Sequence, residues 1–214
     1  MSARGLTIIG GGEHARVVIE TARTRPDLWQ VEGFADPDWC EETQRRLEVS
    51  WLGDDARVLA RCDDKERLYV LGVGAIGAGD ARFRIVKRYH AAGACFASLV
   101  HVHAWVSPTA QLGVGTVVFA GAVVQSGAQI GDHAVVGSGA IIEHDVKLGA
   151  FAQTGPGALV GGGTVIGDGS YLGLGACVRD HLTIGSGVMV AMGAVVTADV
   201  TDGAVVVGVP ARSR

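Results

Sequence analysis

The sequence predicts two joined architectures: an α/β domain of Rossmann-like order, followed by a left-handed parallel β-helix of hexapeptide repeats. Three observations support this. Strand-like and helix-like segments alternate over the first 97 residues, an aliphatic residue recurs at every sixth position from 106 to 196 except at Thr154, and 33 of the 214 residues are glycine. We expect the α/β domain over residues 1–97, the β-helix over 98–200 and a C-terminal tail over 201–214.

The first domain contains short apolar runs that alternate with segments of helical spacing. This alternation is typical of a small parallel sheet covered by helices. The expected elements are a strand that enters a glycine turn over 6–12, a helix over 13–25, strands over 30–36 and 67–74, and a helix over 80–93 that Asp80 caps and Gly93 ends.

The turn GGGEHA, residues 10–15, fits the loose pattern G-x-G-x-x-G/A, and Asp36 follows at the end of the next strand. Such a turn offers backbone N–H groups and a helix N-terminus to a phosphate. A plain tight turn is the simpler interpretation. Because only three or four strands precede the repeat, we expect one nucleotide, such as that of a nucleotide sugar, rather than the dinucleotide of an oxidoreductase.

The sixfold repeat is the stronger signal. Neither a helix of period 3.6 nor a strand of period 2 produces it, whereas three hexapeptides close one coil of a β-helix. A Leu-Gly or Ile-Gly pair recurs every 18 residues, and we expect its glycines, 113, 131, 149, 167 and 185, to supply turns of positive φ. The inward positions are Val106, Leu112, Val118, Val124, Ile130, Val136, Ile142, Leu148, Thr154, Val160, Ile166, Leu172, Val178, Ile184, Val190 and Val196.

Composition excludes several classes of protein. The net charge is −4 without a basic run, which argues against nucleic acid and anionic membranes as partners. The four cysteines lie far apart, which suits a reducing cytoplasm better than a disulfide scaffold or a zinc site. We expect neither a signal peptide nor a membrane helix.

Several stretches together resemble a known family over the whole length of the chain. They are IIGGGEHARVV, VEGFADPD, LVHVHAWVSPTAQLGVG, AVVGSGAIIEHDVKLG and VVVGVPAR. The chain resembles the bacterial nucleotide-sugar N-acetyltransferases, relatives of the sialic-acid O-acetyltransferases. The resemblance implies acetyl-CoA as co-substrate, a UDP- or GDP-linked 4-amino-deoxy sugar as acceptor, no metal, and a homotrimer with active sites between neighbouring β-helices.

The resemblance also assigns roles to individual residues. His144 matches the catalytic base and Glu143 the acid that orients it. Gly162, 18 residues after His144, matches a backbone N–H aimed at the thioester oxygen. The matching residues for the nucleotide sugar are Gly12, His14, Asp36 and Gln153, where Gln153 replaces a histidine of several members and Pro37 separates Asp36 from a second acid, Asp38. For acetyl-CoA we expect contacts from Gly162, Leu174, Gly175, Met192 and Arg212.

The chemistry of the EHD stretch, residues 143–145, points to the same active site. Since Ile142 points inward, Glu143 and His144 should project outward from a turn. An attacking amine must lose a proton, and a free imidazole, with a pKa near 6.5, suits that task. Either Glu143 or Asp145 could fix the tautomer of the ring.

The trimer is also expected from the outward residues, because Val117, Val123, Val135 and Val195 form an apolar surface that a partner should cover. Other functions remain open. O-acetylation of the sialic-acid type uses the same fold, and a noncatalytic β-helix scaffold needs only the repeat. A β-helix carbonic anhydrase would need three histidine ligands, and His133 and His144 lack the expected spacing. His101 and His103, at the domain junction, could line the sugar pocket.

Overall fold

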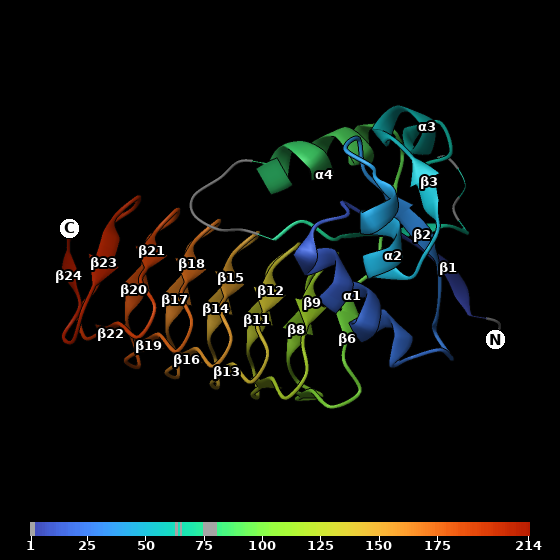
Figure 1. Ribbon diagram of the computed structural model, residues 1–214. Helices are drawn as coiled ribbons and strands as arrows, with labels where there is room; N and C mark the ends of the chain where they lie inside the picture. Colours follow the sequence, from blue (N-terminus) through green and yellow to red (C-terminus); the bar gives the residue numbers. More distant parts are fainter. Residues whose placement is uncertain (1–2, 63, 65, 75–80) are drawn as a thin grey trace. The chain divides into compact units, whose positions relative to one another are not determined.

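The computed structural model describes residues 3–62, 64, 66–74 and 81–214 (Figure 1). The chain forms two compact units, the first reaching Val102 and the second running from His103 to Arg214. Asp80, the expected cap of a helix, lies outside the described residues.

The first unit is built on a five-stranded sheet of order β3-β2-β1-β4-β5, and all its strands are parallel. The three expected strands and both expected helices are present. Four further elements, α2, β3, α3 and β5, were not predicted from the sequence. The elements of the unit are β1 (Arg4–Ile9), α1 (Glu13–Arg23), β2 (Trp29–Ala35), α2 (Glu41–Leu47), β3 (Trp51–Gly53), α3 (Asp55–Leu59), β4 (Leu68–Leu71), α4 (Ala81–Ala91), β5 (Cys95–Phe96) and β6 (Leu99–Val100).

The core of the first unit lies around the central strands. Leu6 and Ile8 of β1 and Val70 of β4 are fully buried, as strands covered on both faces require. Helix α1 packs one apolar face, which includes Val18 and Ile19, toward the sheet. The central position of β1 matters for function, because the chain reverses its winding direction between β1 and β4, where ligands of such sheets bind.

The second unit is a parallel β-helix with three faces. Face I comprises β7 (Trp105–Val106), β10 (Val123–Val124), β13 (Ile141–Ile142), β16 (Leu159–Val160), β19 (Cys177–Val178) and β22 (Val195–Val196). Face II comprises β8 (Gln111–Leu112), β11 (Gln129–Ile130), β14 (Lys147–Leu148), β17 (Val165–Ile166) and β20 (Thr183–Ile184). Face III comprises β9 (Val117–Val118), β12 (Val135–Val136), β15 (Gln153–Thr154), β18 (Tyr171–Leu172), β21 (Met189–Val190), β23 (Val205–Val207) and β24 (Arg212–Ser213).

The repeating aliphatic position is confirmed as the second residue of each strand from β7 to β22. From Val118 onward these residues are buried. Thr154, the one polar member, is fully buried, and its hydroxyl accepts a hydrogen bond of 3.1 Å from the Gly137 N–H. Beyond residue 200 the coil continues, because β23 pairs in parallel with β21 before β24 returns antiparallel.

One expectation about the glycines is wrong. The glycines of the Leu-Gly and Ile-Gly pairs do not have positive φ; they are needed because the next coil lies too close. A Cβ on Gly131 would lie 2.5 Å from the Ala150 nitrogen, and one on Gly167 equally close to the Ser186 nitrogen. Positive φ occurs two residues further along, as at Gly115 with φ 73°.

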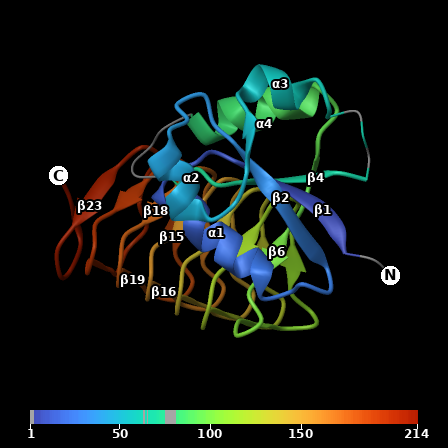
Figure 2. The ribbon, with the colours of Figure 1, turned by 45° about the vertical axis from the view of Figure 1, so that its right-hand side comes forward.

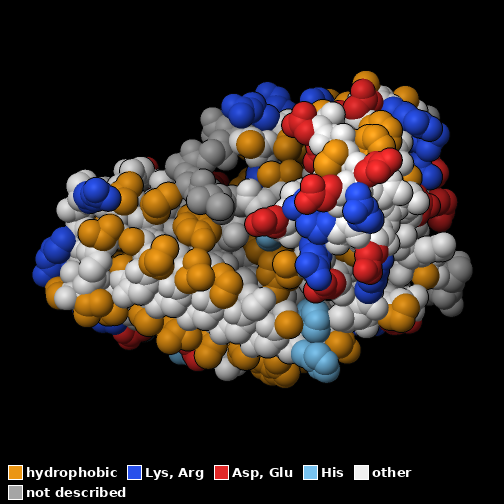
Figure 3. Space-filling model, viewed as in Figure 1, with side chains coloured by type: hydrophobic (Ala, Val, Ile, Leu, Met, Phe, Trp, Pro, Cys, Tyr) orange, Lys and Arg blue, Asp and Glu red, His pale blue; other side chains and the backbone are white. Residues whose placement is uncertain are grey.

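Face I and face II carry different outward side chains. The outward row of face I is apolar throughout, whereas that of face II begins with Gln111, Gln129 and Lys147. Figure 3 shows many hydrophobic and few charged side chains on the visible side of the coils. The outward residues of face I are Trp105, Val123, Ile141, Leu159, Cys177 and Val195.

Two residues of the expected apolar surface are not available to a partner. Val117 and Val135, both on face III, are only 2% exposed within the single chain. Val123 and Val195 belong to face I and are partly exposed. Of the four expected residues, only Val123 and Val195, both on face I, are therefore accessible to a partner.

Candidate active site

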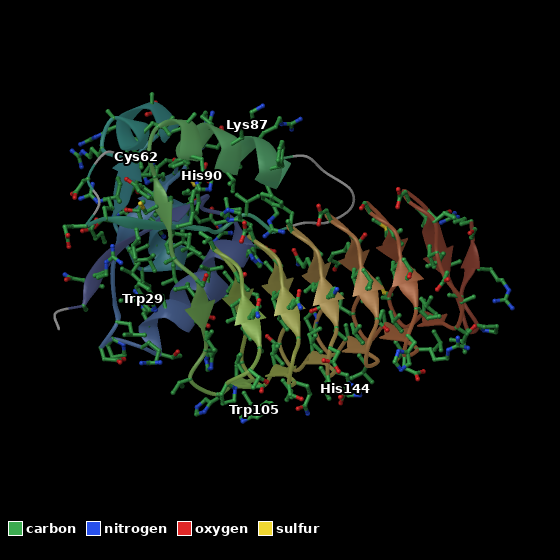
Figure 4. The ribbon with its side chains drawn as sticks, turned by 180° about the vertical axis from the view of Figure 1, so that it is seen from behind. Trp29, Cys62, Lys87, His90, Trp105 and His144 are labelled. Carbon is green, nitrogen blue, oxygen red and sulfur yellow. The ribbon has the colours of Figure 1, made fainter. Side chains whose placement is uncertain are left out.

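His144 lies in the turn between β13 and β14, at the edge that joins face I to face II (Figure 4). Its side chain is 56% exposed. The ring Nδ1 lies 3.0 Å from Oδ2 of Asp145, and the Glu143 carboxylate accepts a hydrogen bond of 3.2 Å from the His144 backbone N–H. The ring partner in this structure is therefore Asp145, whereas Glu143 holds the backbone of the turn.

The backbone conformation explains why Asp145, and not Glu143, contacts the imidazole ring of His144. Asp145 adopts a left-handed conformation, φ 58°, which aspartate tolerates better than most residues. The corresponding residues one coil before and one coil after are glycines, Gly127 and Gly163, with φ 71° and 67°. This conformation turns the Asp145 side chain back toward the ring of the residue before it.

Gly162 lies one coil above His144, as expected. A Cβ on Gly162 would lie 2.6 Å from Nε2 of His144, so the ring occupies the space that a side chain would fill. The next residue, Gly163, donates its N–H to the His144 carbonyl at 2.9 Å. Among the described residues none accepts a hydrogen bond from the Gly162 N–H, which leaves this donor beside the imidazole.

A second charged turn lies one coil beyond these glycines, and its histidine, His181, was not among the residues predicted for the site. A Cβ on Gly163 would lie 2.5 Å from Nδ1 of His181. Glycines 161–163 therefore lie between two turns that each place an imidazole over them, Glu143-His144-Asp145 and Arg179-Asp180-His181. The signal that could have found His181 was its spacing, two coils after Asp145.

Other predicted residues of the acetyl-CoA site lie at the opposite edge of face I. Leu174 and Gly175 are in the turn between β18 and β19, and Met192 is in the turn between β21 and β22. Met192 is 74% exposed and Leu174 50% exposed. Gln153 lies on face III and Arg212 on β24, so a single chain does not bring these residues to His144.

The glycine turn of the first unit follows β1 at the point where the sheet reverses its winding direction. The Gly11 N–H donates to Oδ2 of Asp36 at 2.5 Å, and the Asp38 N–H donates to Oδ1 of the same carboxylate at 2.8 Å. Gly12, the N-cap of α1, has φ −69° and nothing within 4 Å of a Cβ. Asp36 thus binds the protein's own backbone with both oxygens, and Gly12 is open to an approaching group.

His14, in the first turn of α1, packs over Gly74, which follows β4; a Cβ on Gly74 would lie 3.2 Å from its ring. Burial, together with the positive charge of Arg82, lowers the pKa of His14 to about 4. Burial also lowers the pKa of Arg82 to about 10. The imidazole of His14 is therefore neutral at physiological pH.

The described residues contain no cluster of three histidine, cysteine, aspartate or glutamate side chains that could hold a metal ion. No helix in the part of the chain that the structure describes is long and apolar enough to span a membrane.

Comparison with known proteins identifies the family of the chain. A family model, the PglD N-terminal domain, matches residues 5–89. The acetyltransferase domain of PglB from Neisseria gonorrhoeae is 34% identical over 99% of this chain and 100% of its own, with a TM-score of 0.87. The chain belongs to the PglD/PglB family of acetyltransferases. A search of curated proteins found no match.

Solved members of the PglD/PglB family include ligand complexes. The same PglB domain was solved with acetyl coenzyme A and matches with a TM-score of 0.88. PerB from Caulobacter crescentus, solved with CoA and GDP-perosamine, is 31% identical over 98% of this chain and 97% of its own, with a TM-score of 0.76. GDP-perosamine N-acetyltransferase from that organism was also solved with the same ligands after one histidine was replaced by alanine.

Proposed function

We propose that this chain transfers the acetyl group of acetyl-CoA to the amino group of a nucleotide-linked 4-amino-deoxy sugar. The observation that carries the proposal is the pairing of an exposed His144–Asp145 dyad with the open Gly162 N–H, in a chain that matches PglB and PerB over nearly its full length. We expect the protein to act in the cytoplasm, because its four widely separated cysteines suit a reducing compartment.

The dyad suits a direct transfer. With Asp145 accepting from Nδ1–H, the Nε2 lone pair of His144 is free to act as base. The sugar amine attacks the thioester carbon and gives its extra proton to Nε2, and the oxyanion accepts a hydrogen bond from the Gly162 N–H. The tetrahedral intermediate then collapses, the C–S bond breaks, and the CoA thiolate leaves and is protonated. No covalent acyl-enzyme is needed.

The complete site requires more than one copy of the chain. A threefold axis creates head-to-tail contacts, in which one edge of a surface meets the opposite edge of the same surface on the next copy. If face I lines the axis, the edge that carries His144 meets the partner's edge that carries Leu174, Gly175 and Met192. Acetyl-CoA then binds between two subunits, with Arg212 near the far end of the groove and Gln153 outside the proton-transfer step.

The first unit holds the nucleotide. The open Gly12 N–H and the N-terminus of α1 suit a diphosphate, since a backbone without side chains allows close approach. Neutral His14 adds an imidazole beside Gly74 at the same edge of the sheet. Asp36 completes this region at the end of β2.

A substrate panel tests the proposal. Release of the CoA thiol would be followed with acetyl-CoA and GDP- or UDP-linked sugars that carry either an amino or a hydroxyl group at C4. We expect turnover only with the 4-amino sugars and a gain of one acetyl group by mass spectrometry. Turnover of the hydroxyl sugars alone would instead support O-acetylation, and no turnover or binding of any nucleotide sugar would reject the proposal.

A further inference from the structure

The backbone of Gly11 is held by a hydrogen bond on each side of its Cα. Its N–H donates to Asp36 at the end of β2, and its carbonyl accepts a hydrogen bond of 2.9 Å from the Arg46 guanidinium of α2. The backbone at this point tolerates little change, because a Cβ on Gly11 would lie 2.9 Å from Phe34 and 3.0 Å from Thr43. Gly11 is buried, whereas Gly12 is exposed.

Arg46 reaches the turn because α2 packs against α1, as Figure 2 shows. Thr43 and Arg46, three residues apart, lie on the side of α2 that faces the glycine turn. Arg46 also borders a hollow of about 390 Å³ along α1, lined by Glu13, Arg16, Val17 and Glu20. Arg45 borders a different hollow, next to Trp39 and Glu48.

We propose that Asp36 and Arg46 form a clamp on the two peptide groups that flank Gly11, and that this clamp positions the Gly12 and Glu13 N–H groups to bind the diphosphate of the nucleotide sugar. Both are positioning residues in this view. The two hydrogen bonds hold the two peptide planes that flank the Gly11 Cα, Asp36 the Gly10–Gly11 plane and Arg46 the Gly11–Gly12 plane. Because a peptide unit is planar, the plane that Arg46 holds through the Gly11 carbonyl also carries the Gly12 N–H, and the Glu13 N–H follows in the next plane. The inference rests on the proposed function for the identity of the ligand, but the clamp itself is a property of the free protein.

The clamp changes the role expected for Asp36. The carboxylate already accepts two backbone N–H groups, so its first effect is on the shape of the turn and not on the choice of nucleobase. Trp51 strengthens the same corner, since its indole N–H donates to the Asp36 carbonyl at 3.1 Å.

The test compares Arg46→Met with Arg45→Met. The two arginines are adjacent and exposed on one helix, and each variant removes one positive charge. Two quantities would be measured: the KM values for both substrates, and deuterium exchange of the backbone over residues 8–16 in the ligand-free protein. Arg46→Met should raise the KM for the nucleotide sugar about tenfold or more, as the loss of a hydrogen bond from a charged donor implies, and leave the KM for acetyl-CoA unchanged. It should also speed exchange in the glycine turn, and Arg45→Met should do neither.

A second variant, Arg46→Gln, keeps an N–H donor without the charge. Exchange in its glycine turn should be slower than in Arg46→Met and faster than in the wild type. If Arg46→Met raises the KM while exchange stays as in the wild type, Arg46 contacts the ligand directly and the clamp is rejected. Equal behaviour of Arg45→Met and Arg46→Met rejects it too. A wild-type protein that binds no nucleotide sugar would reject the proposed function, whereas the exchange comparison would still report on the clamp.

Discussion

At His144, three neighbours define the chemistry of one imidazole. Asp145 holds Nδ1, Glu143 holds the backbone of the turn, and Gly162 leaves room for the ring. The left-handed backbone of Asp145 is the conformation that this turn position adopts in neighbouring coils as well, since Gly127, Gly163 and His181 share it. What distinguishes Asp145 is its side chain, a carboxylate that contacts the ring of the residue before it.

Replacing His144 by asparagine should lower kcat by about 10²- to 10⁴-fold, the usual contribution of a general base. Because the side chain is exposed, the free energy of unfolding should change by less than about 0.5 kcal/mol. Steady-state kinetics and chemical denaturation measure the two effects. His181→Asn is the matched control, and an equal loss of kcat in both variants would contradict the assignment of His144 as the base.

Gly12→Ala should leave stability unchanged and weaken nucleotide-sugar binding. Gly12 has an ordinary backbone conformation and open space around it, so only a ligand would meet the new methyl group. We expect a raised KM for the nucleotide sugar alone, with an unchanged Tm. Gly11→Ala is the contrasting variant, because its methyl group would crowd Phe34 and Thr43 and should lower the Tm.

His14 should make stability depend on pH. Its folded pKa of about 4 lies below the free value of 6.5, so the unfolded chain binds the proton more readily between these limits. The stability is fully present above about pH 6.5 and is lost as the pH falls toward about 4. Between about pH 7.5 and pH 5 the loss should be about 2 kcal/mol. Denaturation curves of His14→Gln should lack this part of the slope; an identical slope would contradict the buried neutral ring.

At the scale of elements, glycines 161–163 separate two charged turns. Each of the three lacks a side chain for its own reason: Gly161 faces the Asp180 backbone, Gly162 the His144 ring and Gly163 the His181 ring. Gly162 could be predicted from the family resemblance and its spacing from His144, whereas its two neighbours could not be explained from the sequence. Their roles depend on side chains one coil away in each direction, which a repeat pattern alone does not reveal.

Gly162→Ala should reduce kcat while the coil stays folded. The new methyl group would displace the His144 ring, and a shift of about 1 Å at a catalytic group can cost up to about 10² in rate. Gly157→Ala is the control, because it has a positive φ of 67° but open space around it, so it should lower stability and leave kcat unchanged. Kinetics and thermal denaturation of both variants decide whether ring placement or backbone strain matters.

At the scale of the whole molecule, face I should join three copies. A charge placed in the middle of its apolar row, Leu159→Glu, should dissociate the trimer and abolish activity, because the two halves of each site separate. Light scattering coupled to size exclusion measures the mass in solution. Gln129→Glu adds the same charge to face II and should keep both the trimer and the activity. A monomeric wild-type protein would contradict this arrangement.

Most of the fold could be predicted because each inward position of the repeat only has to fill the core of the coil. An aliphatic residue at almost every sixth position predicts the coil directly, and α1 and the glycine turn have strong local sequence signals. The clamp could not be predicted, since α2 has no apolar periodicity and Arg46 acts on a residue 35 positions away. The choice between Asp145 and Glu143 depended on a single left-handed residue.

The uninterrupted coils also give the second unit the property of a ruler. Every coil advances the chain by one strand spacing, about 4.8 Å, and no loop interrupts the series from β7 to β22. The axial distance from His144 to any residue nearer the C-terminus is therefore counted in whole coils. Inserting or removing 18 residues would lengthen or shorten that distance by one coil without turning any later side chain toward another face. A change in length by a number that is not a multiple of 18 would turn every later residue toward the wrong face.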